Sequence, residues 1–223
     1  FPTRRSSDLT ILVTAGGTQE SIDPVRYIGN RSSGKMGYAI AEQAVRMGAK
    51  VILVSAPTSL PIPSGVDFIS VDSAVSMQEA VEARYNDVNV VIMAAAVSDF
   101  RVLHKAEQKI KKMESMTIEL VKNPDILQGL GSKKNHQILV GFAAETEHVI
   151  KYGQDKVARK NLDMLVANDV SKSNAGFNVD TNEGYFLYPD KEPKEMPNMK
   201  KSELARHILR EVIDLVANKA DIN

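Results

Sequence analysis

The chain has 223 residues, of which 43% are hydrophobic, so it can form a full core and is not globally disordered. Its 28 basic and 28 acidic side chains balance, which argues against a general nucleic-acid binder because such proteins usually present a net positive surface. Cysteine is absent, which excludes disulfides, thiol nucleophiles and cysteine-ligated zinc and fits a cytosolic protein, and no apolar run approaches the roughly 20 residues of a membrane span.

The N-terminal stretch FPTRRSSDL, residues 1–9, fits neither a signal peptide nor a helix or strand pattern. It resembles the translation of a common sequencing adapter, so we expect a non-native tail; a natural disordered tail is the alternative. The predicted domain therefore comprises residues 10–223. If the tail is an artefact, the natural protein is cut at Thr10.

Short apolar runs alternate with segments of helical periodicity along the rest of the chain. Strands are expected at residues 10–15, 50–55, 67–71, 88–97, 137–144 and 163–168. Helices are expected at residues 34–48, 73–85, 123–132, 147–161 and 200–216. Ser73 is a plausible N-cap, and Pro124 is expected near the first turn of its helix.

This alternation predicts a doubly wound, mostly parallel, Rossmann-like α/β sheet in one domain. Residues 184–189 are expected to form one arm of a small antiparallel edge, and a basic flap is expected near residues 100–116. Ligands of such sheets gather at the carboxyl ends of the strands. The segments that follow the strands should therefore converge, namely residues 16–18, 94–99, 142–146 and 168–169.

The stretch GNRSSGKMG, residues 29–37, is close to a Walker A phosphate loop, but Met36 stands where the magnesium-binding hydroxyl belongs. A P-loop also follows its strand directly, whereas residues 16–28 separate this stretch from the strand that ends at Ala15. The P-loop interpretation is therefore disfavoured. Two interpretations stay open: a helix start whose free N–H groups favour an anion, or an ordinary serine-capped helix with glycine for close packing.

Two lysine clusters have the spacing to neutralise a triphosphate, although each alone is more often a solvated surface. In KIKK, which follows the strand-end acid Asp99, Lys109 and Lys111 share a face if the segment is extended. Lys156 and Lys160 share a helical face. The sequence contains neither a G-x-G-x-x-G fingerprint nor a hydrolase elbow motif. Its lysines, amides and acids suit charge stabilisation and positioning.

The motifs VTAGGTQESIDPVRYIGNRSSGKMG, AAAVSDF, KIKK, VKNPDIL, GFAAET and KVARKNLDMLVANDV occur in this order. Together, from Thr10 to the final helix, they resemble phosphopantothenoylcysteine synthetase, the phosphopantothenate–cysteine ligase of coenzyme A synthesis. The resemblance implies that 4′-phosphopantothenate and L-cysteine are joined through an acyl-cytidylate, with CTP as co-substrate and Mg²⁺. It also implies a cytoplasmic homodimer whose flap reaches toward the partner's site. In many bacteria the domain is fused to a flavin-dependent phosphopantothenoylcysteine decarboxylase.

The resemblance further implies roles for single residues. Asn30 is expected to stabilise the acyl intermediate, with Arg26 in the same substrate loop, and Lys109 is expected to support cytidylate formation. The expected nucleotide contacts are Met93, Ala94, Ala95, Asp99, Lys109, Pro124, Asp125, Ile126, Leu127, Phe142, Lys156 and Lys160.

The sequence assigns no metal ligands, and spacing does not decide between CTP and ATP, which some relatives use. Two other classes stay open. The chain is a nucleotide-binding sensor or scaffold if the chemical step has been lost, and a dinucleotide-dependent oxidoreductase if it binds NAD(P)H without the fingerprint.

Overall fold

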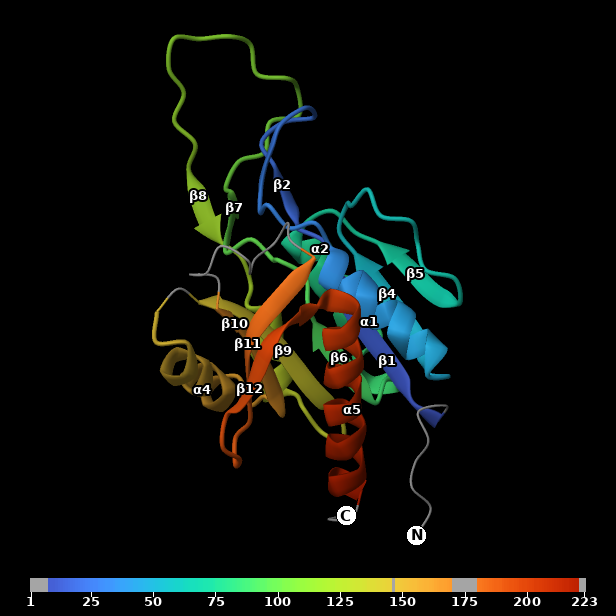
Figure 1. Ribbon diagram of the computed structural model, residues 1–223. Helices are drawn as coiled ribbons and strands as arrows, with labels where there is room; N and C mark the ends of the chain where they lie inside the picture. Colours follow the sequence, from blue (N-terminus) through green and yellow to red (C-terminus); the bar gives the residue numbers. More distant parts are fainter. Residues whose placement is uncertain (1–7, 146, 170–179, 221–223) are drawn as a thin grey trace.

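The structure is a computed structural model that describes residues 8–145, 147–169 and 180–220 (Figure 1). The predicted tail at residues 1–7 and the predicted strand-end residue Thr146 lie outside the described residues. Leu9 is buried, and its carbonyl accepts a hydrogen bond from the Lys50 amide at 2.9 Å. The division of the chain at Thr10 stays a prediction.

Within the described residues, a central sheet is formed by β1 (Thr10–Ala15), β4 (Lys50–Ser55), β5 (Val66–Ser70), β6 (Val90–Met93), β9 (Ile138–Glu145), β10 (Met164–Asp169), β11 (Thr181–Leu187) and β12 (Lys194–Lys200). The strand order is β12-β11-β10-β9-β6-β1-β4-β5. The strands from β10 to β5 pair in parallel, whereas β11 and β12 pair antiparallel. The mostly parallel sheet and its antiparallel edge are therefore as predicted.

Helices cover both faces of the sheet. They are α1 (Lys35–Arg46), α2 (Ala74–Glu82), α3 (Ile126–Ser132), α4 (Val149–Arg159) and α5 (Lys201–Ala220). α1 and α5 pack on one face, and α2, α3 and α4 pack on the other. In β1, Ile11 and Val13 join the first core while Leu12 joins the second, because successive strand residues point to opposite faces. The doubly wound architecture predicted from the sequence is confirmed.

Several element boundaries differ from the prediction. α3 begins at Ile126, because the Asp125 side chain accepts a hydrogen bond from the Gln128 amide at 3.0 Å and caps the helix there. Pro124 therefore lies just before the N-cap, near the first turn as predicted, although the helix begins later than residue 123. β6 ends at Met93 rather than Val97, since the chain then bends to form a parallel bridge between Ala96 and Gly17.

The sequence analysis placed no strand at β12. Its sequence KEMPNMK contains a proline and several charges, which are typical of an edge strand but give no strand signal. By contrast, β1 and β4 have the predicted bounds, and Ser73 caps α2 in a reciprocal capping box with Ser76.

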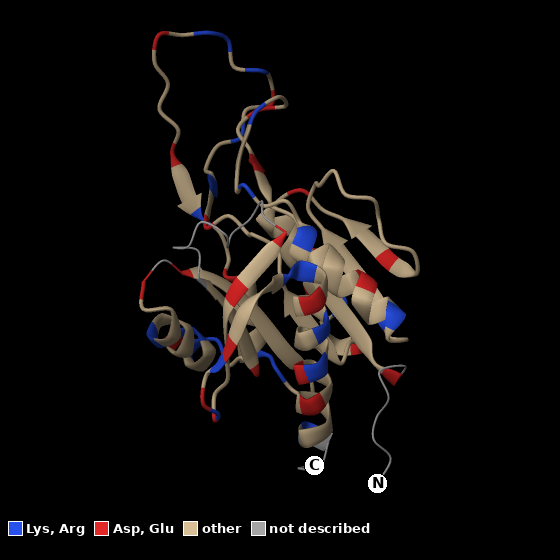
Figure 2. Ribbon diagram, in the orientation of Figure 1, with Lys and Arg blue, Asp and Glu red and all other residues tan. Residues whose placement is uncertain are grey.

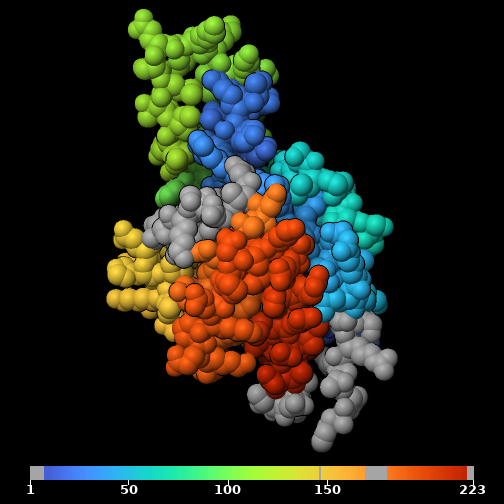
Figure 3. Space-filling model, viewed as in Figure 1, coloured from blue at the N-terminus to red at the C-terminus, as the bar shows by residue number. Residues whose placement is uncertain are grey.

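Two small antiparallel pairs lie outside the central sheet. The hairpin of β2 (Gln19–Ser21) and β3 (Tyr27–Gly29) occupies the stretch between β1 and α1. β7 (Phe100–Val102) pairs with β8 (Leu120–Lys122) at the base of a long loop. The flap spans residues 100–122, which is longer than the predicted 100–116, and it projects from the sheet beside the β2–β3 hairpin (Figures 1 and 3). Within the described chain, no helix combines the length and apolarity needed to cross a membrane.

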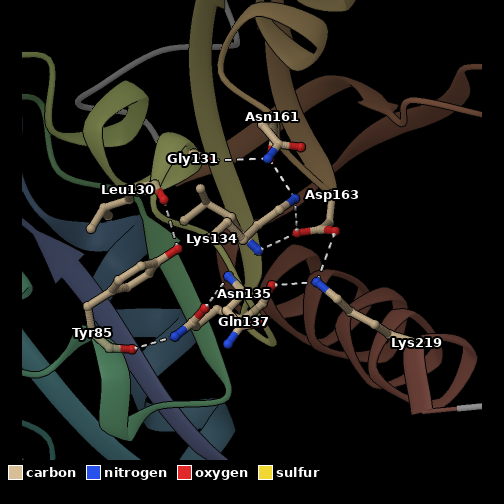
Figure 4. A network of polar contacts seen from close by, with 10 residues as sticks. Tyr85, Leu130, Gly131, Lys134, Asn135, Gln137, Asn161, Asp163 and Lys219 are labelled. Atoms are coloured by element: carbon tan, nitrogen blue, oxygen red, sulfur yellow. Dashed lines mark hydrogen bonds and ion pairs between the residues drawn. The ribbon is translucent and has the colours of Figure 1, made fainter. Parts of the chain in front are cut away.

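A polar network joins α5 to the amino ends of the parallel strands (Figure 4). Asp163, just before β10, accepts hydrogen bonds from Lys134 Nζ at 3.0 Å and from the Leu139 amide at 2.7 Å. Lys219 of α5 lies 4.0 Å from the same carboxylate and donates to the Gln137 carbonyl at 2.9 Å. The network therefore connects α5, β9 and β10 at the end of the sheet opposite to the expected ligand site.

We expect Asp163→Ala to lower the free energy of unfolding by about 3 kcal/mol, because it leaves the ammonium of Lys134 largely buried without its acid. The Lys134 side chain is only 9% exposed. Urea denaturation measures the change, with Glu42→Ala as the control because the Glu42–Arg46 pair is exposed on α1. Breaking that exposed pair should change stability by less than about 1 kcal/mol. Equal, small losses in both variants would show that the network does not stabilise the fold.

Candidate active site

A cleft of about 390 Å³ opens at the carboxyl ends of the strands, beside the point where the strand order reverses between β1 and β6. The chain runs outward from β1 to β4 and β5 on one side, and from β6 to β9 and β10 on the other. Loops diverge at such a switch point and leave a crevice for a ligand. The lining of this first cleft comes from residues 32–36, 94–97, 99 and 142–144, and from Lys156, Asn168, Asn182 and Lys201.

A second cleft of about 240 Å³ adjoins the first and shares Ala95, Val97, Asp99 and Phe142 with it. Of the predicted strand-end segments, residues 94–99, 142–144 and 168 therefore meet at the clefts, and Gly17 joins them through its bridge to Ala96. Of the predicted nucleotide contacts, Ala94 and Lys156 line the first cleft, and the second is lined by Met93, Pro124, Asp125, Ile126, Leu127 and Lys160. Lys109 lines neither cleft.

Lysines of the two clefts carry carboxylate partners in this structure. Lys156 Nζ donates to Glu145, and Lys160 Nζ lies 2.9 Å from Asp125. Burial raises the pKa of Asp125, but hydrogen bonds from the Lys160 ammonium and the Gln128 amide outweigh it, so the net pKa is lowered. These pairs offset part of the positive charge, and a bound polyanion would compete with the carboxylates for it.

The start of α1 forms part of the first cleft. Its N-cap is Gly34, in the left-handed region at φ 76°, and this residue makes no side-chain cap. A Cβ on Gly37 would lie 2.6 Å from the Ala15 Cβ, so the helix approaches β1 closely only because this residue is glycine. The interpretation as a serine-capped helix is therefore wrong about the capping residue, which is Gly34. It is right that a glycine allows close packing, which Gly37 provides. Because the β2–β3 hairpin separates β1 from α1, the segment is not a P-loop.

The β2–β3 hairpin is fastened to the flap through Asp23. The buried carboxylate of Asp23 accepts hydrogen bonds from Arg26 Nη2 at 2.5 Å and from the Ile110 amide at 3.2 Å. Arg26 Nη2 also donates to the Ile110 carbonyl at 3.2 Å. The Arg26 side chain beside it, helped by backbone N–H groups, holds the pKa of Asp23 well below its usual range in spite of burial. Arg26 is thereby held against Ile110, the residue that follows Lys109 in the flap.

The three predicted catalytic residues lie outside the two clefts of their own chain. Arg26 is on the hairpin, and Lys109 is exposed on the basic part of the flap, which projects away from the sheet (Figure 2). Asn30 is exposed between β3 and the cleft residue Ser32, with its carbonyl against Gly17 at the end of β1. Asn30 therefore lies at the edge of the first cleft, while Arg26 and Lys109 belong to the hairpin and flap.

Three polar residues of this region were not found by sequence reasoning. Asp23 lies in DPVR, whose residue types are typical of a turn but do not indicate a contact with the flap. Lys201 lies at the edge of a predicted helix, and Asp180 lies in a polar stretch. Neither position indicates a binding site in the sequence. Only the packing of α5 beside α1 brings Lys201 to the first cleft.

We expect Asp23→Asn to accelerate amide hydrogen exchange in residues 106–112 on the order of tenfold, because the charged acceptor that holds Arg26 and Ile110 is lost. Asp67→Asn, on the exposed edge strand β5, is the control and should leave this exchange unchanged. Because the pKa of Asp23 is lowered in the folded state, its contribution is complete above the unfolded value of about 3.9 and is lost only as pH falls toward the folded value. Exchange that stays unchanged in Asp23→Asn would show that another contact holds the flap.

The chain is similar to known proteins over nearly its whole length. Residues 6–216 match the family described as DNA/pantothenate metabolism flavoprotein C-terminal domain. The coenzyme A biosynthesis bifunctional protein CoaBC of Bacillus subtilis is 49% identical over 207 residues, which cover 92% of this chain and 51% of that protein. This chain spans about half the length of the curated relatives it matches.

Solved structures have the same fold. The crystal structure of the C-terminal domain of CoaBC matches with a TM-score of 0.82 and 44% identity, covering 94% of this chain and 96% of that one. A Cab2 variant in complex with phosphopantothenate-cysteine matches with a TM-score of 0.75 at 18% identity, covering 96% of this chain and 88% of that one, which shows the fold alone. Matched over nearly its whole length in sequence and in fold, the chain belongs to the DNA/pantothenate metabolism flavoprotein C-terminal domain family, as its ordered motifs indicated.

Proposed function

We propose that the chain is a cytoplasmic, CTP-dependent phosphopantothenate–cysteine ligase, which forms 4′-phosphopantothenoyl-L-cysteine in coenzyme A biosynthesis. The observation that carries the proposal is the pair of adjoining clefts at the strand switch point, whose linings contain the residues expected to contact the nucleotide, except Lys109. The fold relative Cab2, in complex with phosphopantothenate-cysteine, supports the substrate class. The second cleft, with Ile126, Leu127 and Phe142, suits a base, and the first, with its lysines, suits phosphates.

The proposed reaction has two steps. In the first, a carboxylate oxygen of 4′-phosphopantothenate attacks the α-phosphorus of CTP, the bond to pyrophosphate breaks, and an acyl-cytidylate forms. In the second, the cysteine amine attacks the acyl carbon, CMP leaves, and the amine loses a proton. Lys156 and Lys160 would neutralise charge on the nucleotide in the first step. Asn30 would donate a hydrogen bond to the oxyanion of the second.

Mg²⁺ would be bound mainly by the phosphates of the nucleotide, with few ligands from the chain. Among the residues that the structure describes, no group of three or more His, Asp and Glu side chains is placed to hold a metal. Mg²⁺ usually binds through one or two carboxylates together with substrate phosphates. Asp99, which lines both clefts, is the residue that would contribute such a carboxylate. The ion would withdraw charge from the phosphate oxygens.

A homodimer is part of the proposal. The flap and hairpin expose a set of large apolar side chains that is unusual for a free surface, namely Val25, Tyr27, Phe100, Leu103, Met113, Met116 and Leu120. A second copy of the chain would cover them. It would also bring Arg26 and Lys109, which line neither cleft of their own chain, to the cleft of the partner.

We further propose that the natural protein carries a flavin-dependent phosphopantothenoylcysteine decarboxylase domain. The relatives are named bifunctional, and this chain spans about half of their length. The decarboxylase would consume the product of the ligase. The proposal includes no nucleic-acid partner and no membrane partner.

Pyrophosphate release tests the ligase. With 4′-phosphopantothenate and CTP, we expect a single burst without cysteine and continuous turnover with it, and slower release with ATP. Binding of CTP without any release would contradict the ligase and favour a nucleotide sensor. Binding of NAD(P)H in place of CTP would favour an oxidoreductase.

A further inference from the structure

The first cleft has a second basic side, which the family resemblance does not assign. Lys35 is the first residue of α1 and Lys201 is the first residue of α5, and both line the cleft. These helices pack on one face of the sheet, whereas α4, which carries Lys156, packs on the other. Cations therefore approach the cleft from both faces of the sheet.

Lys201 is buried although it is charged, with only 7% of its surface exposed. Its amide donates to the Asp180 carbonyl at 2.9 Å, which fixes the start of α5. Burial, followed by repulsion from the Lys35 ammonium, lowers the pKa of Lys201, and Asp180 only partly opposes this. Both lysines line the same side of the cleft, and an anion bound there would offset their positive charge.

Asp180, the acid that interacts with both lysines, is easily displaced by another anion. Asp180 Oδ1 lies 2.7 Å from Lys35 Nζ, but its side chain is 81% exposed and that of Lys35 is 37% exposed. Exposed ion pairs contribute little to stability because water and salt screen them. Solvent would screen the interaction of a phosphate inside the cleft less than it screens this exposed pair. The phosphate would also attract both ammonium groups, so it would compete well with the Asp180 carboxylate.

We propose that Lys35 and Lys201 form a phosphate-binding subsite on the α1–α5 side of the first cleft, where Asp180 is the counter-ion that a bound phosphate displaces from Lys35. The subsite rests on the proposed ligase function for its ligand. Two phosphate sources are available there: the β- and γ-phosphates of CTP, and the phosphomonoester of 4′-phosphopantothenate.

Calorimetric titration of single variants tests the subsite and identifies the source. The variants are Lys201→Met, Lys35→Met and Lys201→Arg, with Lys200→Met as the control because Lys200 is exposed and lies outside the cleft lining. The ligands are CTP, CMP, 4′-phosphopantothenate, pantothenate and inorganic tripolyphosphate. We expect Lys201→Met to weaken one of the two phosphate-bearing substrates about tenfold and Lys201→Arg to retain most of the affinity.

The ligand pairs separate the two sources. If the subsite holds the β- and γ-phosphates, Lys201→Met and Lys35→Met weaken CTP and leave CMP unchanged. If it holds the phosphomonoester, they weaken 4′-phosphopantothenate and leave pantothenate unchanged. Lys200→Met should bind every ligand as the unmodified chain does.

A stability measurement separates a binding role from a structural one. Replacing a buried charge by Met is often neutral or stabilising, so the melting temperature of Lys201→Met should not fall. A lowered melting temperature with all ligands weakened equally would overturn the subsite, as would unchanged affinities for both CTP and 4′-phosphopantothenate. Failure of the ligase is a different result: pyrophosphate release is then absent in the unmodified chain, while tripolyphosphate still binds and still depends on Lys201.

Discussion

Asn30→Asp is expected to lower formation of phosphopantothenoylcysteine by about 10²–10³-fold while the acyl-cytidylate still forms. Attack by cysteine places negative charge on the former carbonyl oxygen, and the Asn amide can donate a hydrogen bond to it. Asp has nearly the same shape, but its ionised form has no donor and repels the charge. Losing one such donor costs roughly 3 to 4 kcal/mol at the chemical step. In the first step the charge develops on phosphate, so that step should be affected less.

Rapid-quench analysis with CTP and 4′-phosphopantothenate should show the acyl-cytidylate accumulating in this variant, even after cysteine is added. Asn86→Asp is the matched control, because Asn86 is exposed at the amino end of β6, away from both clefts. Asn30 lies next to Gly17 at the end of β1, so a purely structural role must also be measured. Equal loss of both steps together with a lowered melting temperature would contradict the catalytic role.

Lys109→Gln is expected to slow pyrophosphate release about a hundredfold and to slow the transfer to cysteine less. A cation beside a transferring phosphoryl group stabilises the charge of the transition state, and its removal costs on the order of 3 kcal/mol. Lys105→Gln is the control, because Lys105 is exposed on the flap but lies outside KIKK. Unchanged pyrophosphate release in Lys109→Gln would remove Lys109 from the first step.

Mixing Lys109→Gln with Asn30→Asp tests whether the flap serves the partner's cleft. If each site combines Asn30 of one subunit with Lys109 of the other, a mixed dimer contains one unmodified site, and random mixing restores about a quarter of the activity. If both residues act within one subunit, every site in every mixed dimer carries one change and no activity returns. The second result would leave the exposed flap without its proposed role in the dimer.

Short-range patterns in the sequence were sufficient for the body of the fold. β1 and β4 were predicted with their observed bounds, because strands buried on both faces are continuous apolar runs ended by small or polar residues. Ser73 was predicted as a cap because serine is favoured at helix starts, and the structure shows it capping α2 together with Ser76. The ordered motifs then indicated the family. The two lysine clusters, one of them following the strand-end acid Asp99, indicated a polyanion site, since parallel strands bring their carboxyl ends to one edge.

The tertiary structure alone decided the contacts between distant segments. Asp23 meets Ile110, and Lys35 meets Asp180, across 87 and 145 residues of chain respectively. No window of sequence contains both partners, and each pair exists only after the sheet order has placed α1 beside α5 and the hairpin beside the flap. The strand β12 and the position of Lys201 beside the cleft were likewise decided only by the tertiary structure. Capping and hydrophobic periodicity act within a few residues, so the sequence by itself indicated most elements and the family. The geometry of a cleft depends on how the layers of the fold pack. Packing therefore decided which charged side chains face the ligand.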